Sequence, residues 1–389
     1  MQRKTLNVIH SIDAWLPTTQ KWMYDELIYL PKNIKNHVLC EYTTNIDQFK
    51  IDDIHSIHDI HPTLVKINNT LKSINLNFHF NSFREKIVTD FKVKILHSHF
   101  GPTAWYNLKV ARKTRIKHVV SFYGFDVGFI PLKWEKWRKR YDMIFKEVDA
   151  VLCEGPFMAQ SIINLGCPKD KVIVHHLGVG VEKIEYKPRE WNKNEPLRVL
   201  IASSFTEKKG IPFGIAALGK LKKEVPLQIT LIGDGIGSSK RRKEKEIILS
   251  MIKQYKLDSH TRLLGYQPYD ILMREAYNHH IYLSPSITAS DGDSEGGVPV
   301  SLIEMSASGM PVVSTRHCDI PEVIKYNSSC QLADERDIDG LVNCFRWLIN
   351  NVDKWRNILD KNRQHIELEY NASLQGKKLA KIYQGLIEN

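Results

Sequence analysis

The sequence predicts an α/β protein made of two domains, each built around a parallel β-sheet with helices on both faces. The chain has 389 residues, more than one ordinary hydrophobic core organises and enough for two domains. Along both halves, short apolar runs typical of buried parallel strands alternate with longer amphipathic segments. Repeated strand–helix alternation of this kind is typical of doubly wound, Rossmann-like sheets.

The predicted strands fall into two groups separated by a polar segment. In the first half they cover residues 6–10, 37–40, 93–97, 118–122, 150–153 and 172–175; in the second, 198–202, 228–232, 262–264, 281–283 and 312–314. Helices are expected between them, for example at 104–113 and 134–146. Residues 187–196 are polar and contain two prolines, which predicts a linker. We therefore expect a first domain over residues 1–187, a second over 188–365, and a terminal helical segment over 366–389.

Composition narrows the class of protein. Hydrophobic residues make up 42% and charged residues 25%, as in ordinary globular proteins, and no apolar run is long enough to span a bilayer. The apolar stretch near the start is interrupted by His10 and Asp13 and has no small-residue cleavage site after it, so we do not expect a signal peptide. Six scattered cysteines without CxxC spacing indicate reduced thiols in a cytoplasmic protein. The net charge is +11, but no nucleic-acid-binding motif accompanies it, so no nucleic-acid partner is expected.

The most informative stretch runs from residue 282 to 324 and predicts a strand, a long loop, a helix and another strand. Pro299 suits the first turn of that helix, and Gly309 suits its C-terminal cap. The pair Gly296–Gly297 lets the backbone approach a ligand just before a helix N-terminus, which favours anions such as phosphate. Glu304 lies about one and a half turns into the helix, where it can face the same ligand.

A second stretch, residues 197–218, predicts the same arrangement of a strand, a loop and a helix. A strand ends, a charged loop follows, and Gly210 precedes a helix. Lys209 therefore lies where its ammonium group can meet a phosphate at the carboxyl end of a strand.

Together these stretches resemble the large retaining glycosyltransferase family whose two-domain architecture is called GT-B, in which two Rossmann-like domains with parallel sheets face each other across a cleft. The family pattern is a glutamate, a glycine-rich turn, a second glutamate and a helix ending in "ASGxPVV"; here these are Glu295, Gly296–Gly297, Glu304 and residues 307–313. Further matches lie at 154–155, 208–210, 232–235 and 264–266. Residues 315–322 match "TRHxxIPE", which is similar to family 4-like members that build bacterial surface polysaccharides.

The resemblance implies roles for individual residues. Lys209 would stabilise the diphosphate leaving group, Glu304 would bind the donor ribose, and Glu295 would hold hydroxyls of the transferred sugar. In the first domain, Tyr123 and Asp126 belong to a loop that faces the reaction centre in the family. The remaining expected donor-binding residues are Ser204, Gly265, Tyr266, Gly296, Gly297, Val298, Val300 and Ser301.

Three positions depart from the family pattern. The two glutamates have eight residues between them instead of seven, so Asp293 is a rival to Glu295 for the sugar contact. Ser204 stands where the family often has an arginine, and Lys208 or Arg316 is the candidate replacement. Tyr123 stands where the family usually has a histidine, and a phenol is a poor base near neutral pH.

The activity implied is retaining, metal-independent transfer of a hexose from a UDP- or GDP-linked sugar to a glycan or lipid-linked glycan, with no cofactor beyond this co-substrate. Residues 291–293 have the spacing of a metal-binding DxD motif but lie in the glycine loop, so no metal is expected there. The family also implies that the terminal helix, 366–389, packs back on the first domain. A catalytically silent nucleotide-sugar-binding scaffold, and less favoured a UDP-sugar epimerase, are the alternatives.

Residues 133–141 mix aromatic and basic side chains at helical spacing. Two interpretations stay open: an aromatic core stripe beneath a solvated basic face, or peripheral docking to the inner face of the cell membrane beside a lipid-linked acceptor. The turn at 233–237 lacks the third glycine of a dinucleotide fingerprint and is interpreted as a strand-end turn. The histidine pairs at 175–176 and 279–280 lack metal-ligand spacing and are interpreted as structural.

Overall fold

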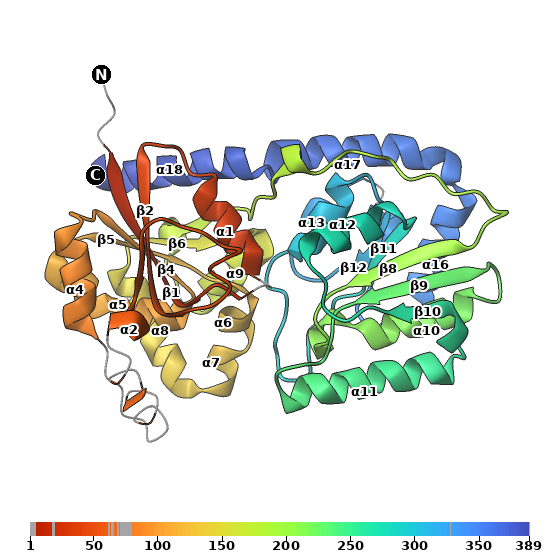
Figure 1. Cartoon of the computed structure of the whole chain (residues 1–389), viewed down its shortest axis with the longest axis horizontal. Coiled ribbons are helices and arrows are strands. Elements are labelled where there is room, and N and C mark those ends of the chain that lie inside the picture. The colour runs from red at the N-terminus through yellow and green to blue at the C-terminus, as the bar shows by residue number, and fades with distance from the viewer. Residues whose placement is uncertain are drawn as a thin grey trace. The chain divides into compact units, whose positions relative to one another are not determined.

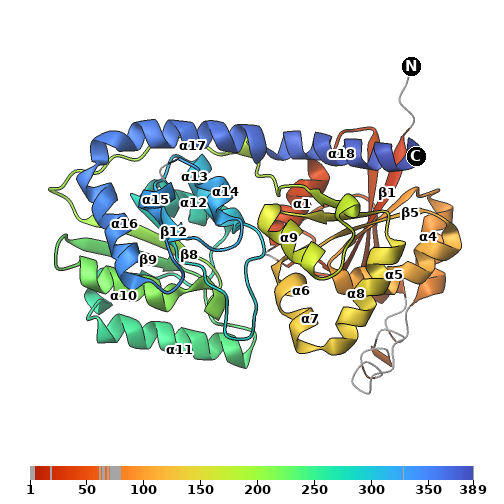
Figure 2. The same cartoon turned by 180° about the vertical axis from the view of Figure 1, so that it is seen from behind.

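The computed structural model describes residues 5–17, 20–60, 63, 66–67, 70, 80–326 and 328–388. The chain forms two compact units, which Figures 1 and 2 show from opposite sides. The first unit contains Met1–Gly178 and Ala372–Asn389, and the second contains Val179–Asn371. Within the described ranges, no helix combines the length and apolar character that crossing a membrane requires.

The first unit is built on a seven-stranded sheet in the order β3-β2-β1-β4-β5-β6-β7, and all neighbouring strands are parallel. Its strands are β1 (Leu6–Trp15), β2 (Ile34–Thr43), β3 (Ile54–Ser56), β4 (Ile95–His99), β5 (Lys117–Ser121), β6 (Ala150–Cys153) and β7 (Val172–Val174). Its helices are α1 (Lys21–Ile28), α2 (Ile57–Ile60), α4 (Asn81–Asp90), α5 (Gly101–Thr114), α6 (Gly124–Gly128), α7 (Ile130–Lys133), α8 (Glu135–Glu147), α9 (Pro156–Asn164) and the terminal α18 (Ala372–Glu388).

Apolar side chains from the two faces of this sheet enter separate parts of the core. Helices α4, α5 and α8 pack on one face, and α1 and α18 pack on the other. Leu379, Ala380 and Tyr383 of α18 are buried against Val8 and Ile95 of the sheet. Burying both faces is what makes the strands continuously apolar in sequence.

The second unit is built on a six-stranded parallel sheet in the order β10-β9-β8-β11-β12-β13. Its strands are β8 (Leu197–Ala202), β9 (Leu227–Ile232), β10 (Thr261–Leu263), β11 (Ile281–Ser284), β12 (Val312–Thr315) and β13 (Leu332–Ala333). Its helices are α10 (Ile211–Leu221), α11 (Ser239–Gln254), α12 (Tyr269–Tyr277), α13 (Val300–Ala307), α14 (Ile320–Val323), α15 (Ser328–Gln331), α16 (Ile338–Asn350) and α17 (Trp355–Glu369). Helices α10, α11 and α16 cover one face and α12 and α13 cover the other, while α17 adds Trp355 and Leu359 to the first part of the core and Ile366 to the second. The predicted fold class, two parallel Rossmann-like sheets, is confirmed.

The boundaries of the units differ from the expected 187/188 and 365/366. Val179, Val181 and Ile184 pack into the core of the second unit, so that unit begins before the polar segment. Ile366 and Tyr370 are buried in the same core, so the terminal piece of the first unit begins only at 372. The polar segment is itself held in place, because the buried guanidinium of Arg189 donates hydrogen bonds to the backbone oxygens of Ala276 and His279 at the end of α12 and of Ser308 after α13.

Local differences from the predicted strands have simple causes. The strand predicted at 93–97 instead covers 95–99, because residues 91–93 close the C-terminus of α4 with backbone hydrogen bonds and Lys92 adopts a positive φ of 49°. The edge strands β3 and β13 are only three and two residues long and were not predicted. Such short edge strands carry too few residues to show a periodicity.

Candidate functional site

The order of strands in the second sheet reverses between β8 and β11. In open α/β sheets, ligands bind at the carboxyl ends of the strands at such a switch point. Lys209 follows β8, and the loop with Glu295 follows β11, so both belong to this edge. Gly210 has a positive φ of 60°, and a Cβ there would lie 1.9 Å from the backbone oxygen of Pro285. Only glycine therefore allows the Lys209 loop to approach the chain leaving β11 this closely.

Lys209 and Glu295 form an ion pair at this edge. The Lys209 Nζ lies 2.8 Å from Oε1 and 2.9 Å from Oε2 of Glu295, and the Ser286 hydroxyl donates to Oε1 at 3.1 Å. The two side chains are 17% and 7% exposed. Burial raises the pKa of Glu295, but the positive charges of Lys209 and Lys208 outweigh it, and the net shift is downward. The pair is therefore ionised and fixed in position.

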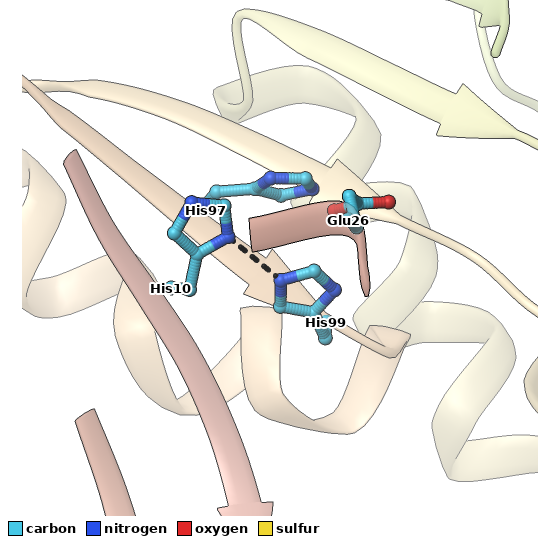
Figure 3. Close-up of side chains that lie close together, drawn as sticks. All are labelled: His10, Glu26, His97 and His99. Carbon is cyan, nitrogen blue, oxygen red and sulfur yellow. Dashed lines mark hydrogen bonds between the residues drawn. The ribbon is translucent and has the colours of Figure 1, made fainter. Parts of the chain in front are cut away.

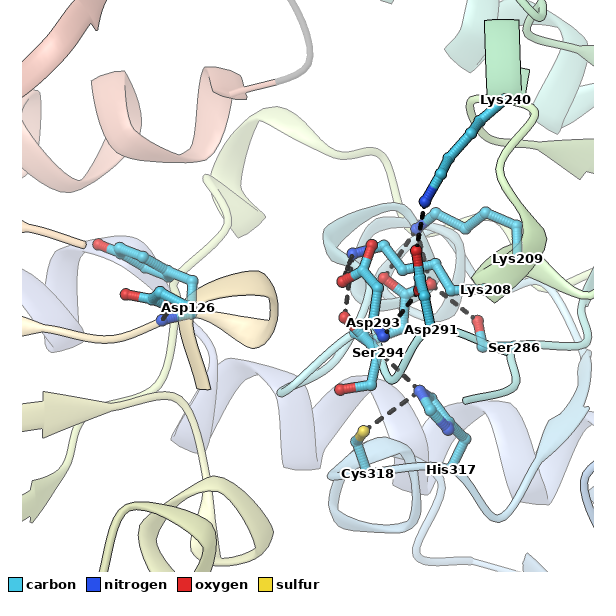
Figure 4. Close-up of polar contacts among 12 residues, drawn as sticks. Asp126, Lys208, Lys209, Lys240, Ser286, Asp291, Asp293, Ser294, His317 and Cys318 are labelled. Atoms are coloured by element: carbon cyan, nitrogen blue, oxygen red, sulfur yellow. Dashed lines mark hydrogen bonds and ion pairs between the residues drawn. The ribbon is translucent and has the colours of Figure 1, made fainter. Parts of the chain in front are cut away.

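The neighbouring carboxylates in the glycine loop are held by other lysines, as Figure 4 shows. Lys208 Nζ binds Asp293 Oδ1 at 3.1 Å and the backbone oxygen of Ser294 at 2.9 Å, and Lys240 pairs with Asp291 at 2.6 Å. Lys209 thus pairs with Glu295, whereas the rival Asp293 pairs with Lys208. Because Asp291 and Asp293 are each held by an ammonium group, the DxD spacing is explained by loop anchoring.

Helix α13 begins directly after the glycine turn, where Gly296 has a positive φ of 76°. Its Ser301 hydroxyl lies 2.8 Å from the Tyr282 hydroxyl, which donates to the backbone oxygen of Ala202 at the end of β8. Burial raises the pKa of Tyr282, and the nearby carboxylates of Glu304 and Glu295 raise it further. Glu304 is 6% exposed, and its charge and that of Glu295 act in the same direction on the pKa of this buried tyrosine. Gly297, Val298 and Val300 lie in the short segment that joins them.

The other expected donor-binding residues lie around the ends of β9 and β10. Gly265 adopts a positive φ of 67° and accepts a backbone hydrogen bond from Gly233 at 2.8 Å. The Tyr266 hydroxyl donates to the backbone oxygen of Asp234 at 3.1 Å. Ser204 lies between two residues whose backbone N–H groups bind Ile232 and Asp234. These contacts join Ser204, Gly265 and Tyr266 to one strand-end turn.

Neither candidate replacement for the missing arginine is a free cation. Lys208 binds Asp293, and Arg316 pairs with Asp334 at 2.9 Å. Burial raises the pKa of Tyr266, and the positive charge of Arg241 partly offsets this shift. Arg241 is in the first turn of α11 and was missed by the sequence reasoning. The basic run at 240–245 was the available signal.

His317 was also missed as a functional residue, although it lies in the "TRHxxIPE" match. Its Nε2 accepts the backbone N–H of Glu295 at 3.1 Å, and its Nδ1 lies 2.6 Å from Oε1 of Glu335. The Cys318 Sγ lies 3.2 Å from the same Nε2, and burial raises the pKa of this thiol to about 12. His317 therefore fixes the backbone that carries Glu295, and Cys318 stays a thiol.

In the first unit, Tyr123 and Asp126 follow β5 and begin α6. The Asp126 carboxylate accepts backbone hydrogen bonds from Tyr123 at 2.7 Å and Gly101 at 2.8 Å. Burial raises its pKa to about 7, although these hydrogen bonds oppose the shift. The Tyr123 hydroxyl lies 2.8 Å from His99 Nδ1, and burial holds the pKa of this phenol well above its ordinary value. Asp126 thus caps a helix, and Tyr123 is turned into the protein.

Residues 183–365 match the family described as "Glycosyl transferases group 1", and residues 22–183 match "Glycosyltransferase Family 4". The amylovoran biosynthesis glycosyltransferase AmsK of Erwinia amylovora is 31% identical over 303 residues, 76% of this chain and 71% of that protein. WcaL of Escherichia coli (strain K12), named for colanic acid biosynthesis, is 27% identical over 332 residues, 82% of this chain and 79% of that protein.

Solved structures show the same fold. A glycosyltransferase from Rickettsia africae superimposes with a TM-score of 0.76 at 18% identity, covering 99% of both chains. Anabaena Alr3699/HepE in complex with UDP-glucose gives a TM-score of 0.72 at 14% identity, covering 98% of this chain and 100% of that one. Together with the two parallel sheets, these likenesses confirm the GT-B fold.

Proposed function

The chain belongs to the GT-B glycosyltransferases of the family 4-like type, and from this premise we propose that it transfers a hexose from a nucleotide diphosphate sugar to a glycan, with retention of anomeric configuration. The observation that carries the proposal is the buried ion pair between Lys209 and Glu295 at the switch point of the second sheet. Relatives named for amylovoran and colanic acid biosynthesis support a role in bacterial polysaccharide assembly.

The donor diphosphate is proposed to bind beside Lys209. Two of the three ammonium N–H groups of Lys209 serve the two oxygens of Glu295, and the third remains for a phosphate oxygen. A fixed cation at the leaving group stabilises the charge that develops as the sugar–phosphate bond breaks. The donor chemistry therefore calls for no cofactor other than the co-substrate. Glu304 is proposed to bind the ribose and Glu295 a sugar hydroxyl, since both carboxylates lie near Tyr282.

The acceptor is proposed to bind the first unit and to give its proton to the departing phosphate. Tyr123 does not serve as the base, because burial raises the pKa of its phenol. Both oxygens of Asp126 are used by backbone N–H groups, so we propose that this residue positions the loop that follows β5.

We further propose that a UDP- or GDP-linked sugar is the donor, that the acceptor is a growing or lipid-linked glycan, and that the reaction takes place on the cytoplasmic face of the membrane. A UDP-glucose complex of a structural neighbour supports a nucleotide-sugar partner. Trp137 and Tyr141 of α8 are buried, as the core-stripe interpretation expects, whereas Trp134 and Leu132 are 40% and 62% exposed. They are followed in sequence by the basic face of α8, formed by Lys136, Arg138, Lys139 and Arg140, of which Arg140 is half-buried and stacks on the rings of Trp105 and Trp137. These exposed aromatic and basic groups support peripheral membrane docking.

A donor panel tests the proposal. UDP- and GDP-sugars are screened by thermal shift, and one donor is expected to stabilise the chain by about 2.7 kcal/mol at a hundredfold excess over its dissociation constant. That donor should be hydrolysed slowly without acceptor, and Lys209→Ala should lower this rate about 100- to 1000-fold. Lys220→Ala is the matched control, because Lys220 pairs with Asp339 at an exposed position. A flat response to every sugar nucleotide would count against the proposal.

A catalytically silent scaffold is the second candidate. It is favoured by Ser204 and Tyr123, which stand where the family often has an arginine and a histidine. Stabilisation by a donor with no hydrolysis and no transfer in the wild-type chain would select the scaffold over the enzyme. Conversion of the sugar nucleotide to its epimer would instead select the third alternative.

A further inference from the structure

A cluster of three histidines and one glutamate lies in the first unit, apart from the residues assigned above to the donor. His10 is on β1, His97 and His99 are on β4, and Glu26 is on α1 (Figure 3). One ligand atom from each of the four side chains lies within 4.8 Å of the others. His10 and His97 are opposite each other in the parallel register, and His99 is two residues further along the same face of β4.

The cluster occupies the switch point of the first sheet. The strand order of that sheet reverses between β1 and β4, where α/β proteins bind ligands at the carboxyl ends of their strands. His99 is the last residue of β4. The cluster therefore lies where this fold places a functional group.

From this arrangement, we propose that the first unit binds a divalent transition-metal ion of the zinc class through His10 Nδ1, His99 Nε2 and Glu26. Two nitrogens and one carboxylate form a ligand set that suits zinc and leaves a fourth position open. His10 Nδ1 and His99 Nε2 are 3.1 Å apart. Two nitrogens bound to zinc at tetrahedral geometry are separated by roughly 3.3 Å, so only a small adjustment is needed.

The protonation states of the cluster suit a cation. Burial lowers the pKa of His10 to about 3 and holds the pKa of His99 well below its ordinary value, so both rings are neutral, and in the metal-free chain one of the two facing nitrogens donates a hydrogen bond to the other. Burial raises the pKa of Glu26 to about 8, and no cation among the described residues lowers it. Its Oε1 is buried and has no hydrogen-bond partner there. A metal ion would supply the charge that this carboxylate lacks.

Groups behind the ligands can hold them in the required orientation. His99 Nδ1 faces the Tyr123 hydroxyl at 2.8 Å, so a proton on Nδ1 leaves Nε2 free for the ion. Such outer partners fix the tautomer of histidine ligands in metal sites. His97 contacts the hydroxyls of Tyr383 at 2.6 Å and Ser121 at 2.7 Å, so it forms the wall of the site.

The test uses the full chain without a purification tag, stripped of metal and titrated with Co²⁺ and Zn²⁺. We expect one ion per chain and a visible Co²⁺ spectrum of low coordination number. Loss of an outer partner typically weakens binding 10- to 100-fold, so Glu26→Gln and His99→Gln, which remove ligands, should each weaken it at least 100-fold. His118→Gln is the matched control, since His118 is buried in the same unit and binds Ser98 on the opposite face of the sheet.

The proposal is overturned if the wild-type chain takes up no stoichiometric Co²⁺ or Zn²⁺ at micromolar concentration, or if both ligand variants bind like the control. Should the variants fail to fold, zinc-edge X-ray absorption of the wild-type chain decides. A first shell of nitrogen and oxygen with two imidazoles supports the site. A sulfur ligand would place the ion at Cys318 and His317 and refute the assignment.

Discussion

The ion pair between Lys209 and Glu295 predicts separable effects on stability and catalysis. Lys209→Met leaves the Glu295 carboxylate, 7% exposed, without its closest cation. Removing one partner of a buried pair costs about 3–5 kcal/mol. Lys208 also acts on Glu295, so we expect the lower end, about 3 kcal/mol. For a domain of this size, that loss corresponds to a fall in melting temperature of about 6–12 °C.

Calorimetry of a double-mutant cycle measures this effect. Glu295→Gln removes the stranded charge, so Lys209→Met with Glu295→Gln should recover about 2 kcal/mol relative to Lys209→Met alone, while donor hydrolysis stays lost. The matched control is Lys220→Met, whose pair with Asp339 has side chains 44% and 77% exposed. An exposed pair of this kind contributes at most about 1 kcal/mol. Equal losses for the two lysine variants, or no recovery in the double variant, would refute the reasoning.

The same pair fixes the sign of a pH effect. Because the folded-state pKa of Glu295 is lowered, its contribution to stability is present above the ordinary glutamate value of 4.5 and is lost as the pH falls through the folded value. The difference in unfolding free energy between the wild type and Glu295→Gln should therefore be constant near neutral pH and should shrink in acid below about 4.5. A difference that grows as the pH falls would contradict this assignment.

Three further predictions concern backbone, capping and surface. Gly210→Ala should lower the free energy of unfolding in urea by more than about 3 kcal/mol, because the new Cβ would lie 1.9 Å from a backbone oxygen. The control is Gly385→Ala in α18, where a Cβ meets nothing within 4 Å and the substitution should raise the free energy of unfolding by up to about 1 kcal/mol. Asp126→Ala should cost about 2–4 kcal/mol in the same assay, because two buried backbone N–H groups lose their acceptor. Substituting glutamate for the residues of the basic face of α8 should weaken co-sedimentation with anionic vesicles at least tenfold. The same substitution of the exposed Arg242 and Lys243 of α11 should leave co-sedimentation unchanged. Equal effects of the two sets of substitutions would contradict specific docking through α8.

The sequence predicted those features that depend on local chemistry. Pro299 and Gly309 bracket α13, which covers Val300–Ala307, because a proline lacks the N–H that a first turn does not use and a glycine accepts the positive φ of 83° that ends the helix. The sequence likewise placed Lys209 and Glu295 after predicted strands. Because the carboxyl ends of parallel strands share one edge of a sheet, it predicted that both residues lie at that edge.

Features that depend on which strands are neighbours could not be predicted. Pairing of His10 with His97 requires β1 and β4 to be adjacent, although these two register partners are 87 positions apart in the sequence (97 − 10). The order of the strands along the sequence does not give their order in the sheet. The terminal Tyr383, which contacts His97, lies still further along the chain. Tertiary packing also placed residues 179–187, which were expected in the first domain, in the second unit, because Val179, Val181 and Ile184 are buried in its core.

The charges around Lys209 bear on how a site without the usual arginine could still bind a diphosphate. Lys208, Lys209 and Lys240 are each held by a carboxylate of the loop that follows β11. A lysine ammonium has three donors, so a phosphate can join as a further acceptor without breaking these pairs. The carboxylates then pre-position the cations, and little side-chain entropy is lost when the donor binds. We therefore propose that these pre-positioned lysines, although none is a free cation, together take the role of the arginine that Ser204 replaces.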